Sequence, residues 1–188
     1  YDLKGNKTEE NSYKSNGYLD TKIIYKYDSK GNKIEENTYK SDGSLSVKFA
    51  YVYDSKGYVI EKNFYDSESN FNGKYTFKYD SKGNEIEEKQ FNIDGSSDTK
   101  FIYKYDSKGN LIQKDIDYDN FITKTTYSYD SEGNIIEENI YDSGGNIERT
   151  ESYEYTYDSN RNWINRVLKD NNGVVKEITE RRIIYYNN

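Results

Sequence analysis

A repeat of 26 residues constrains this chain more than any other feature of its sequence. The dipeptide Tyr-Asp occurs seven times at the same place in the repeat, with successive intervals of 26, 26, 26, 26, 24 and 28 residues. Its tyrosines are Tyr1, Tyr27, Tyr53, Tyr79, Tyr105, Tyr129 and Tyr157. No proline interrupts the series. Because self-similarity at a fixed period is typical of repeat architectures, we expect residues 1–188 to form a single repeat array.

Each repeat predicts two β-strands. In residues 101–105 the aromatic side chains of Phe101, Tyr103 and Tyr105 alternate with Ile102 and Lys104. Alternation of this kind in aromatic and β-branched residues indicates a strand with one apolar face. A second, returning strand follows each Tyr-Asp turn. The repeat therefore predicts an all-β fold, an antiparallel meander of two-strand repeats joined by tight turns.

Two kinds of turn join these strands. In Asp28-Ser-Lys-Gly31 the carboxylate can accept backbone N–H groups, and the glycine can adopt a positive φ. This geometry explains why the octapeptide YKYDSKGN at residues 25–32 returns unchanged at 103–110, without a catalytic role. The second turn varies but usually contains Asn-Gly or Asp-Gly, and in the third repeat we place it at residues 70–73. The unit at 115–122 lacks the glycine and is two residues shorter.

The returning strand raises a question of parity. In the strand from Ile34 to Tyr39, the isoleucine and the aromatic residue are five positions apart, so regular alternation would put them on opposite faces. We expect a one-residue β-bulge near Glu35–Asn37 that returns both to one face, and we expect it to recur through the array.

The composition favours a folded sheet, since disordered chains are poor in aromatic residues and this one contains 23 tyrosines. The aromatic face needs cover. The sheet can coil into a spiral with the tyrosines inside, or stay a single extended layer in which Tyr, Ile, Lys and Glu side chains cover one another. Because open sheets of more than about ten strands tend to curl, we favour coiling.

Charge and residue usage limit the possible functions. The net charge of −7 arises from acids and bases mixed along the chain, whereas a nucleic-acid-binding protein would show a basic patch. The absence of Cys and His excludes disulfides, thiol nucleophiles, His-based triads and His-ligated zinc. No apolar run approaches the roughly 20 residues of a membrane-spanning helix. A chain that opens on Tyr1 is expected to have lost a signal peptide or a longer precursor segment.

The acidic residues do not predict catalysis. Pairs such as Glu35-Glu36 recur at one place in the repeat, which indicates a solvated ladder paired with lysines on neighbouring strands rather than a glycosidase site. Asp115, Asp117 and Asp119 have the alternation of calcium ligands, but the glycine and the distant glutamate of an EF-hand loop are missing. These three residues are only a weak metal candidate, and we predict no cofactor and no catalytic residue.

The aromatic face is either a core or a binding surface, since aromatic rings can be buried or can stack on sugars. If part of it is accessible, the candidate binding residues are Tyr25, Tyr27, Tyr51, Tyr53, Tyr79, Tyr103, Tyr105, Tyr129, Tyr157 and Trp163.

The recurring motif Tyr-Asp-x-x-Gly-Asn resembles the YD repeat of Rhs and teneurin-type proteins. The resemblance covers nearly the whole chain, although Asn rather than Arg mostly follows the glycine and the spacing is longer. It implies a spiral of β-strands that can form a shell. The tail from Tyr157 to Tyr185 also resembles the C-termini of uncharacterised secreted bacterial proteins with such repeats, which implies a secreted or cell-surface location.

The end units differ from the others. Residues 1–26 form a partial first unit, and residues 157–188, in which Arg161 replaces the turn glycine, predict a divergent capping unit. The leading hypothesis is a non-enzymatic secreted or surface β-repeat protein with a structural role, contacting a protein partner or a copy of itself. The alternative is a carbohydrate-binding module that uses exposed tyrosines and Trp163.

Overall fold

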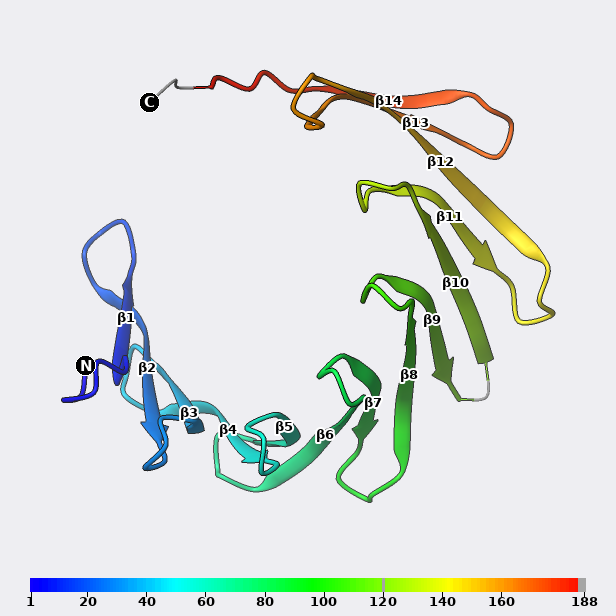
Figure 1. Ribbon diagram of the computed structural model, residues 1–188. Coiled ribbons are helices and arrows are strands. Elements are labelled where there is room, and N and C mark those ends of the chain that lie inside the picture. Colours follow the sequence, from blue (N-terminus) through cyan, green and yellow to red (C-terminus); the bar gives the residue numbers. More distant parts are fainter. Residues whose placement is uncertain (120, 186–188) are drawn as a thin grey trace. The chain divides into compact units, whose positions relative to one another are not determined.

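The computed structural model describes residues 1–119 and 121–185, and every helix-or-strand element in this part of the chain is a β-strand (Figure 1). The strands are β1 (Glu9–Tyr13), β2 (Leu19–Tyr27), β3 (Lys33–Lys40), β4 (Leu45–Tyr53), β5 (Val59–Tyr65), β6 (Phe71–Tyr79), β7 (Glu85–Phe91), β8 (Ser97–Tyr105), β9 (Leu111–Tyr118), β10 (Phe121–Tyr129), β11 (Ile135–Tyr141), β12 (Ile147–Tyr157), β13 (Trp163–Lys169) and β14 (Val175–Glu180). Their order in the sheet is their order in the sequence. The predicted all-β antiparallel meander is therefore confirmed.

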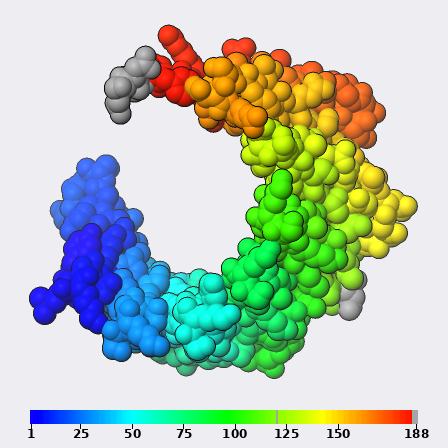
Figure 2. All heavy atoms as spheres, in the orientation of Figure 1, coloured from blue at the N-terminus to red at the C-terminus, as the bar shows by residue number. Residues whose placement is uncertain are grey.

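The chain divides into two compact units, Tyr1–Lys100 and Phe101–Asn188, with the boundary inside β8. In the first unit β1 to β7 pair in succession, and in the second β9 to β14 do so, always antiparallel. Within each unit a strand contacts only the strands that precede and follow it in sequence. Each unit is thus a single layer of strands, and Figure 2 shows its heavy atoms as spheres.

The Tyr-Asp turns have the predicted chemistry. One carboxylate oxygen of Asp28 accepts the backbone N–H groups of Lys30 and Asn32, both at 2.8 Å, and the other accepts the Asn32 side-chain amide at 2.9 Å. Gly31 has a φ of 93°. The same set of hydrogen bonds recurs in later turns, for example around Asp80 and Asp106. This part of the repeated octapeptide builds the turn.

The second turn of the third repeat was predicted in the wrong place. Its hydrogen bonds join Asp66 to Asn70, and Ser69 takes the positive φ, 65°, that glycine has elsewhere. Gly73 lies inside β6, where an added Cβ would stand 2.5 Å from the carbonyl oxygen of Phe91 and 2.7 Å from the Phe64 ring. Close packing between strands and a positive φ of 136°, rather than a turn, therefore require the glycine.

The predicted β-bulges recur, but their predicted position was wrong. The register runs unbroken through Glu35–Asn37 and shifts next to the turn, where Tyr27 pairs with Lys33 and Ile34 is the extra residue. Shifts at the equivalent place occur in β4–β5, β6–β7, β10–β11 and β12–β13. The aromatic residue of the returning strand stays on the face opposite Tyr25, because it packs against a lysine there. Lys124 lies 3.8 Å from the centre of the Tyr141 ring.

No hydrophobic side chain in the described residues is buried, so the tyrosines do not form an enclosed core. Within each unit the side chains are covered in the way that the single-layer alternative describes. Long side chains supply the cover, because their methylene groups can lie on apolar surface while the charge stays in water. The Lys62 ammonium stands 4.2 Å from the centre of the Phe49 ring, and that of Lys33 stands 4.9 Å from the Tyr51 ring.

Candidate functional site

Strand pairing separates the side chains of each unit into two faces, because directly paired residues point to the same side. In the first unit the tyrosine face carries Tyr25, Tyr27, Tyr51, Tyr53 and Tyr79. In the second unit it carries Tyr129, Tyr157 and Trp163, while Tyr103 and Tyr105 alternate along β8. Beside them lie second glutamates such as Glu36, which pairs with Tyr25 and Phe49. The ladder face carries the charged residues between them. In the first unit it includes Glu9, Lys22, Lys26, Glu35, Lys48, Glu61, Lys74, Lys78 and Glu87.

In four repeats the hydroxyl of the Tyr-Asp tyrosine makes a hydrogen bond across the sheet to a backbone carbonyl. Tyr27 donates to the backbone carbonyl of Lys7 at 2.8 Å, and Tyr53 donates to that of Lys33 at 2.6 Å. Further such hydroxyl links join Tyr79 to Val59 at 2.9 Å and Tyr129 to Leu111 at 2.7 Å. The accepting residue lies 20 positions before the tyrosine in the first three links and 18 positions before it in the fourth. The fourth link is shorter because the repeat that ends at Tyr129 is two residues shorter. These four hydroxyls serve the fold.

The tyrosine two residues earlier has a different partner. Tyr25 donates to the Glu10 carboxylate at 2.9 Å, and Tyr51 donates to that of Glu36 at 3.3 Å. Burial and the hydrogen bond to Glu10 raise the pKa of Tyr25 to about 12. The Lys33 ammonium bonds Glu36 at 2.5 Å and lies over both tyrosine rings. The second glutamate of each pair thus belongs to the tyrosine face.

The ten predicted site residues are all half-buried. Their rings follow one another along the strands of each unit rather than converging on one cavity, and Tyr103 and Tyr105 also take part in interactions. Trp163 differs from the others, because the Arg181 guanidinium covers its ring at 4.1 Å and Tyr155 meets it edge-on. A ligand could reach this face only by stacking on ring surface that lysine and arginine side chains leave open.

The predicted charge ladder is formed by the first glutamate of each pair. Glu35 receives Lys26 at 2.6 Å from one neighbouring strand and Lys48 at 2.9 Å from the other, and the Asn37 amide donates to it at 2.8 Å. Burial opposes the ionisation of Glu35, but these hydrogen bonds outweigh it and lower its pKa to about 2. Charges so closely paired hold strands in register.

The three aspartates proposed as a weak metal candidate do not gather. Asp115 accepts both its hydrogen bonds from the Gln113 amide, at 2.9 and 2.8 Å, and pairs with Lys124. Asp117 pairs with Ile122, and Asp119 lies in the turn with a φ of 50°. In the described ranges no group of three acidic side chains is arranged to hold a metal ion.

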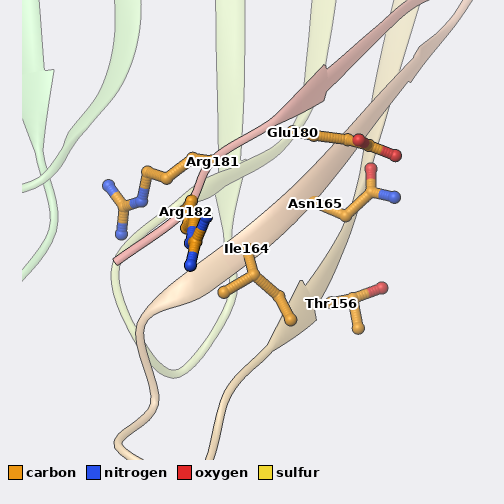
Figure 3. A pocket seen from close by; sticks show the side chains of 6 residues that line it. All are labelled: Thr156, Ile164, Asn165, Glu180, Arg181 and Arg182. Carbon is orange, nitrogen blue, oxygen red and sulfur yellow. The ribbon is translucent and has the colours of Figure 1, made fainter. Parts of the chain in front are cut away.

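A hollow at the open edge of β14 was not found from the sequence. It measures about 540 Å³ and is lined by Thr156, Ile164, Asn165, Glu180, Arg181 and Arg182, which we call the C-terminal notch. Thr156, Asn165 and Glu180 pair across β12, β13 and β14 and extend to one side, and Arg181 extends to the other (Figure 3).

Within the described residues the side-chain oxygen of Asn165, a residue that lines the C-terminal notch, is buried without a hydrogen-bond partner. The unusual density of arginine near Trp163 is the sequence signal that could have located it. No helix in the described residues is long and apolar enough to cross a membrane.

No protein-family model matches the chain, and no curated protein matches it either. Solved structures with a similar arrangement include a porin-like protein from Bacteroides uniformis, at 15% identity and a TM-score of 0.52, covering 91% of this chain and 88% of that one. The toxin complex TcdB2-TccC3 is similar at 15% identity and a TM-score of 0.49, and a Tc holotoxin pore from Photorhabdus luminescens at 16% and 0.44. The matches cover 95% and 85% of this chain but only 13% and 9% of those. At such identities the likeness to the porin-like protein concerns the fold alone.

Proposed function

We propose that this chain is a non-enzymatic β-repeat protein, secreted or displayed on a cell surface, with a structural role that depends on contact with another protein or another copy of itself. The observation that carries this proposal is that the residues of the recurring motif have structural roles. The Tyr-Asp tyrosine closes a hydroxyl link, the aspartate and asparagine build the turn, and the first glutamate joins lysines of neighbouring strands.

The absence of an enclosed core supports the same role. Because strands contact only their neighbours within each unit, every added pair of strands stabilises itself against the previous one, as in other repeat proteins. Such an array extends a surface rather than enclosing a site. The resemblance of the motif to the YD repeat supports the secreted or surface location.

Removing residues 28–79 tests the modular part of this proposal. The deletion takes out two repeat lengths and joins Tyr27 to Asp80, so the Tyr-Asp turn is kept. We expect a shorter, cooperatively folded protein with a β-sheet circular dichroism spectrum and protected amides in the remaining strands. A deletion of residues 28–66, which puts the repeat out of phase, is the matched control. It should disrupt strand pairing at the point where the two remaining parts of the chain are joined. Complete unfolding of the in-phase variant would contradict a modular array.

A carbohydrate-binding role is the second candidate, and one observation favours it. The C-terminal notch is lined by Asn165 and by Arg181, whose guanidinium lies on the Trp163 ring, and amide and guanidinium groups bind sugar hydroxyls. Screening on a glycan array, followed by titration of Trp163 fluorescence in the natural chain and in Asn165→Ala, separates the two roles. Saturable binding that Asn165→Ala abolishes would replace our proposal, and an empty array would remove the alternative.

A further inference from the structure

Three Asn-Gly dipeptides occur in the chain, and the structure places them in two different settings. They are Asn16-Gly17, Asn72-Gly73 and Asn172-Gly173. An asparagine followed by glycine can lose its side-chain amide without an enzyme. The backbone nitrogen of the glycine, which no side chain shields, attacks the Cγ atom of the asparagine. In a folded protein the rate of this reaction depends on whether that nitrogen is free to move.

The first and the third dipeptide lie at the tips of the β1–β2 and β13–β14 hairpins. Both glycines are exposed, with φ values of 83° and 74°, and no described atom lies within 4 Å of a Cβ built on either. Gly17 donates its N–H to the Lys14 carbonyl at 2.9 Å. Gly173 donates its N–H to the Asp170 carbonyl, also at 2.9 Å. A single hydrogen bond at an exposed turn opens at low cost, so both nitrogens become available for attack.

The second dipeptide lies inside the sheet. Gly73 is buried in β6 and pairs with Phe64 of β5. The next residue, Lys74, pairs with Phe91 of β7, so β6 has a partner strand on each side. Ring closure would turn the peptide group between Asn72 and Gly73 out of its strand conformation. That requires β6 to separate from its neighbours, and the opening of a central strand costs far more than the opening of a turn.

The turn at Asn16 also assists the reaction. Its side-chain oxygen accepts the backbone N–H of Tyr18 at 3.2 Å. When the glycine nitrogen attacks Cγ, negative charge develops on this same oxygen, and a donor that is already in place stabilises the charge. At Asn172 the corresponding N–H, that of Val174, donates instead to the Asp170 carboxylate at 3.0 Å. The geometry therefore favours Asn16 over Asn172.

We propose that Asn16 and Asn172 are sites of spontaneous deamidation and that the sheet protects Asn72. In the first step hydroxide removes the glycine N–H proton and the nitrogen bonds to Cγ. The side-chain nitrogen takes a proton from water, which restores the hydroxide, and leaves as ammonia. In the second step one water molecule opens the resulting succinimide ring at either carbonyl, which gives aspartate or isoaspartate. This inference goes beyond the proposed function and does not depend on it.

The fold accepts an aspartate at this place in the turn. Asp42 and Asp94 take the corresponding position in other repeats, each directly before a glycine of positive φ. The Asp42 carboxylate accepts the N–H of Ser44 at 2.9 Å, which is the bond that Asn16 makes at its own turn. Isoaspartate instead adds a methylene group to the backbone of a tight turn that fixes the register of β1 against β2. The aspartate product should therefore keep the hairpin, and the isoaspartate product should loosen it.

Peptide mapping by mass spectrometry tests the proposal on the natural chain. The folded protein and the protein unfolded in urea are kept in the same mildly alkaline buffer, and the deamidated fraction at each dipeptide is followed with time. In urea all three should react at similar rates. Folding should slow Asn16 and Asn172 by no more than about tenfold, the effect of one hydrogen bond. It should slow Asn72 by about a hundredfold or more, which corresponds to ~2.7 kcal/mol for opening β6.

A gain-of-site variant tests the role of the turn. Asp42→Asn creates the same dipeptide at the corresponding turn, where the Ser44 N–H is in place to donate to the new side chain. In the folded variant this position should deamidate at about the rate of Asn16. Asn16→Asp is the matched control for the product, and it should keep the urea midpoint of the natural chain. Amide hydrogen exchange should become faster in β1 only in the isoaspartate form.

Two results would overturn the proposal. One is a folded chain in which Asn72 reacts as fast as it does in urea, because the sheet would then give no protection. The other is a folded chain in which Asn16 and Asn172 react as slowly as Asn72. An Asp42→Asn variant that stays unmodified at this position would overturn the assignment of the reaction to the turn.

Discussion

Replacing Tyr53 by phenylalanine removes one hydroxyl from the molecule and keeps the ring. That hydroxyl donates to the Lys33 carbonyl at 2.6 Å, and it closes the end of the β3–β4 hairpin away from its turn. An intramolecular hydrogen bond of this kind contributes a net 0.5–1.5 kcal/mol or so, so we expect the free energy of unfolding to fall by about 1 kcal/mol. Tyr27 and Tyr79 make the same link one repeat away, roughly 10 Å across the sheet at two strand spacings. Because sites that far apart act independently, the triple variant should lose about 3 kcal/mol.

Urea unfolding followed by circular dichroism measures these losses, and amide hydrogen exchange shows whether the opening is confined to the hairpin that lost its link. Tyr39→Phe is the matched control, since among the described residues the Tyr39 hydroxyl makes no hydrogen bond. The reasoning fails if Tyr53→Phe and Tyr39→Phe cost the same, or if the triple variant is no less stable than the single one.

Four further outcomes are expected from backbone conformation and charge. Arg161 occupies the turn position of glycine with a φ of 62°, so Arg161→Gly should raise the free energy of unfolding by about 1 kcal/mol in urea, and an unchanged midpoint would contradict the strain. Gly73→Ala should lower the free energy of unfolding by about 2 kcal/mol or more, because the new methyl would meet a backbone oxygen at 2.5 Å. A loss below roughly 0.5 kcal/mol would contradict this, since it would show that the strands move apart at little cost. The folded-state pKa values of Tyr25 and Tyr157 are raised to about 12, so their contribution to stability is complete below pH 10 and disappears as the pH rises to 12. The folded-state pKa of Glu35 is lowered from 4.5 to about 2, so its contribution to stability is complete above pH 4.5 and disappears as the pH falls through 2. Urea unfolding midpoints measured across the alkaline and the acid range show whether stability falls at both ends, as expected.

The turns and the strand alternation could be predicted because their causes are local. The bonds that shape Asp28–Asn32 join residues no more than four positions apart, and the rings of β8 lie at every second position of one short strand. Gly73 was misassigned for the opposite reason. Its sequence context matches a hairpin turn, but the atoms that require glycine belong to Phe64 and Phe91 on neighbouring strands, and only the register brings them there.

The candidate site divides in the same way. Within one strand, alternation alone predicts that neighbouring site residues such as Tyr25 and Tyr27 share a face. The hydrogen-bond acceptors of their hydroxyls could not be predicted. A hydrogen bond between residues 20 positions apart depends on the turn length and on the bulge at residues such as Ile34. The C-terminal notch depends on residues of the three strands β12, β13 and β14, and no other repeat offers a template for Arg182.

The lack of an enclosed core also has a thermal consequence. Unfolding a globular domain raises the heat capacity by about 12–15 cal/mol/K per residue, chiefly because apolar surface buried in the native state becomes hydrated. Here much of that surface is already in contact with water, since no hydrophobic side chain of the described residues is buried. Scanning calorimetry should therefore give a smaller heat-capacity increment per residue. The free energy of unfolding would then curve only gently with temperature, and the protein would keep its stability in the cold.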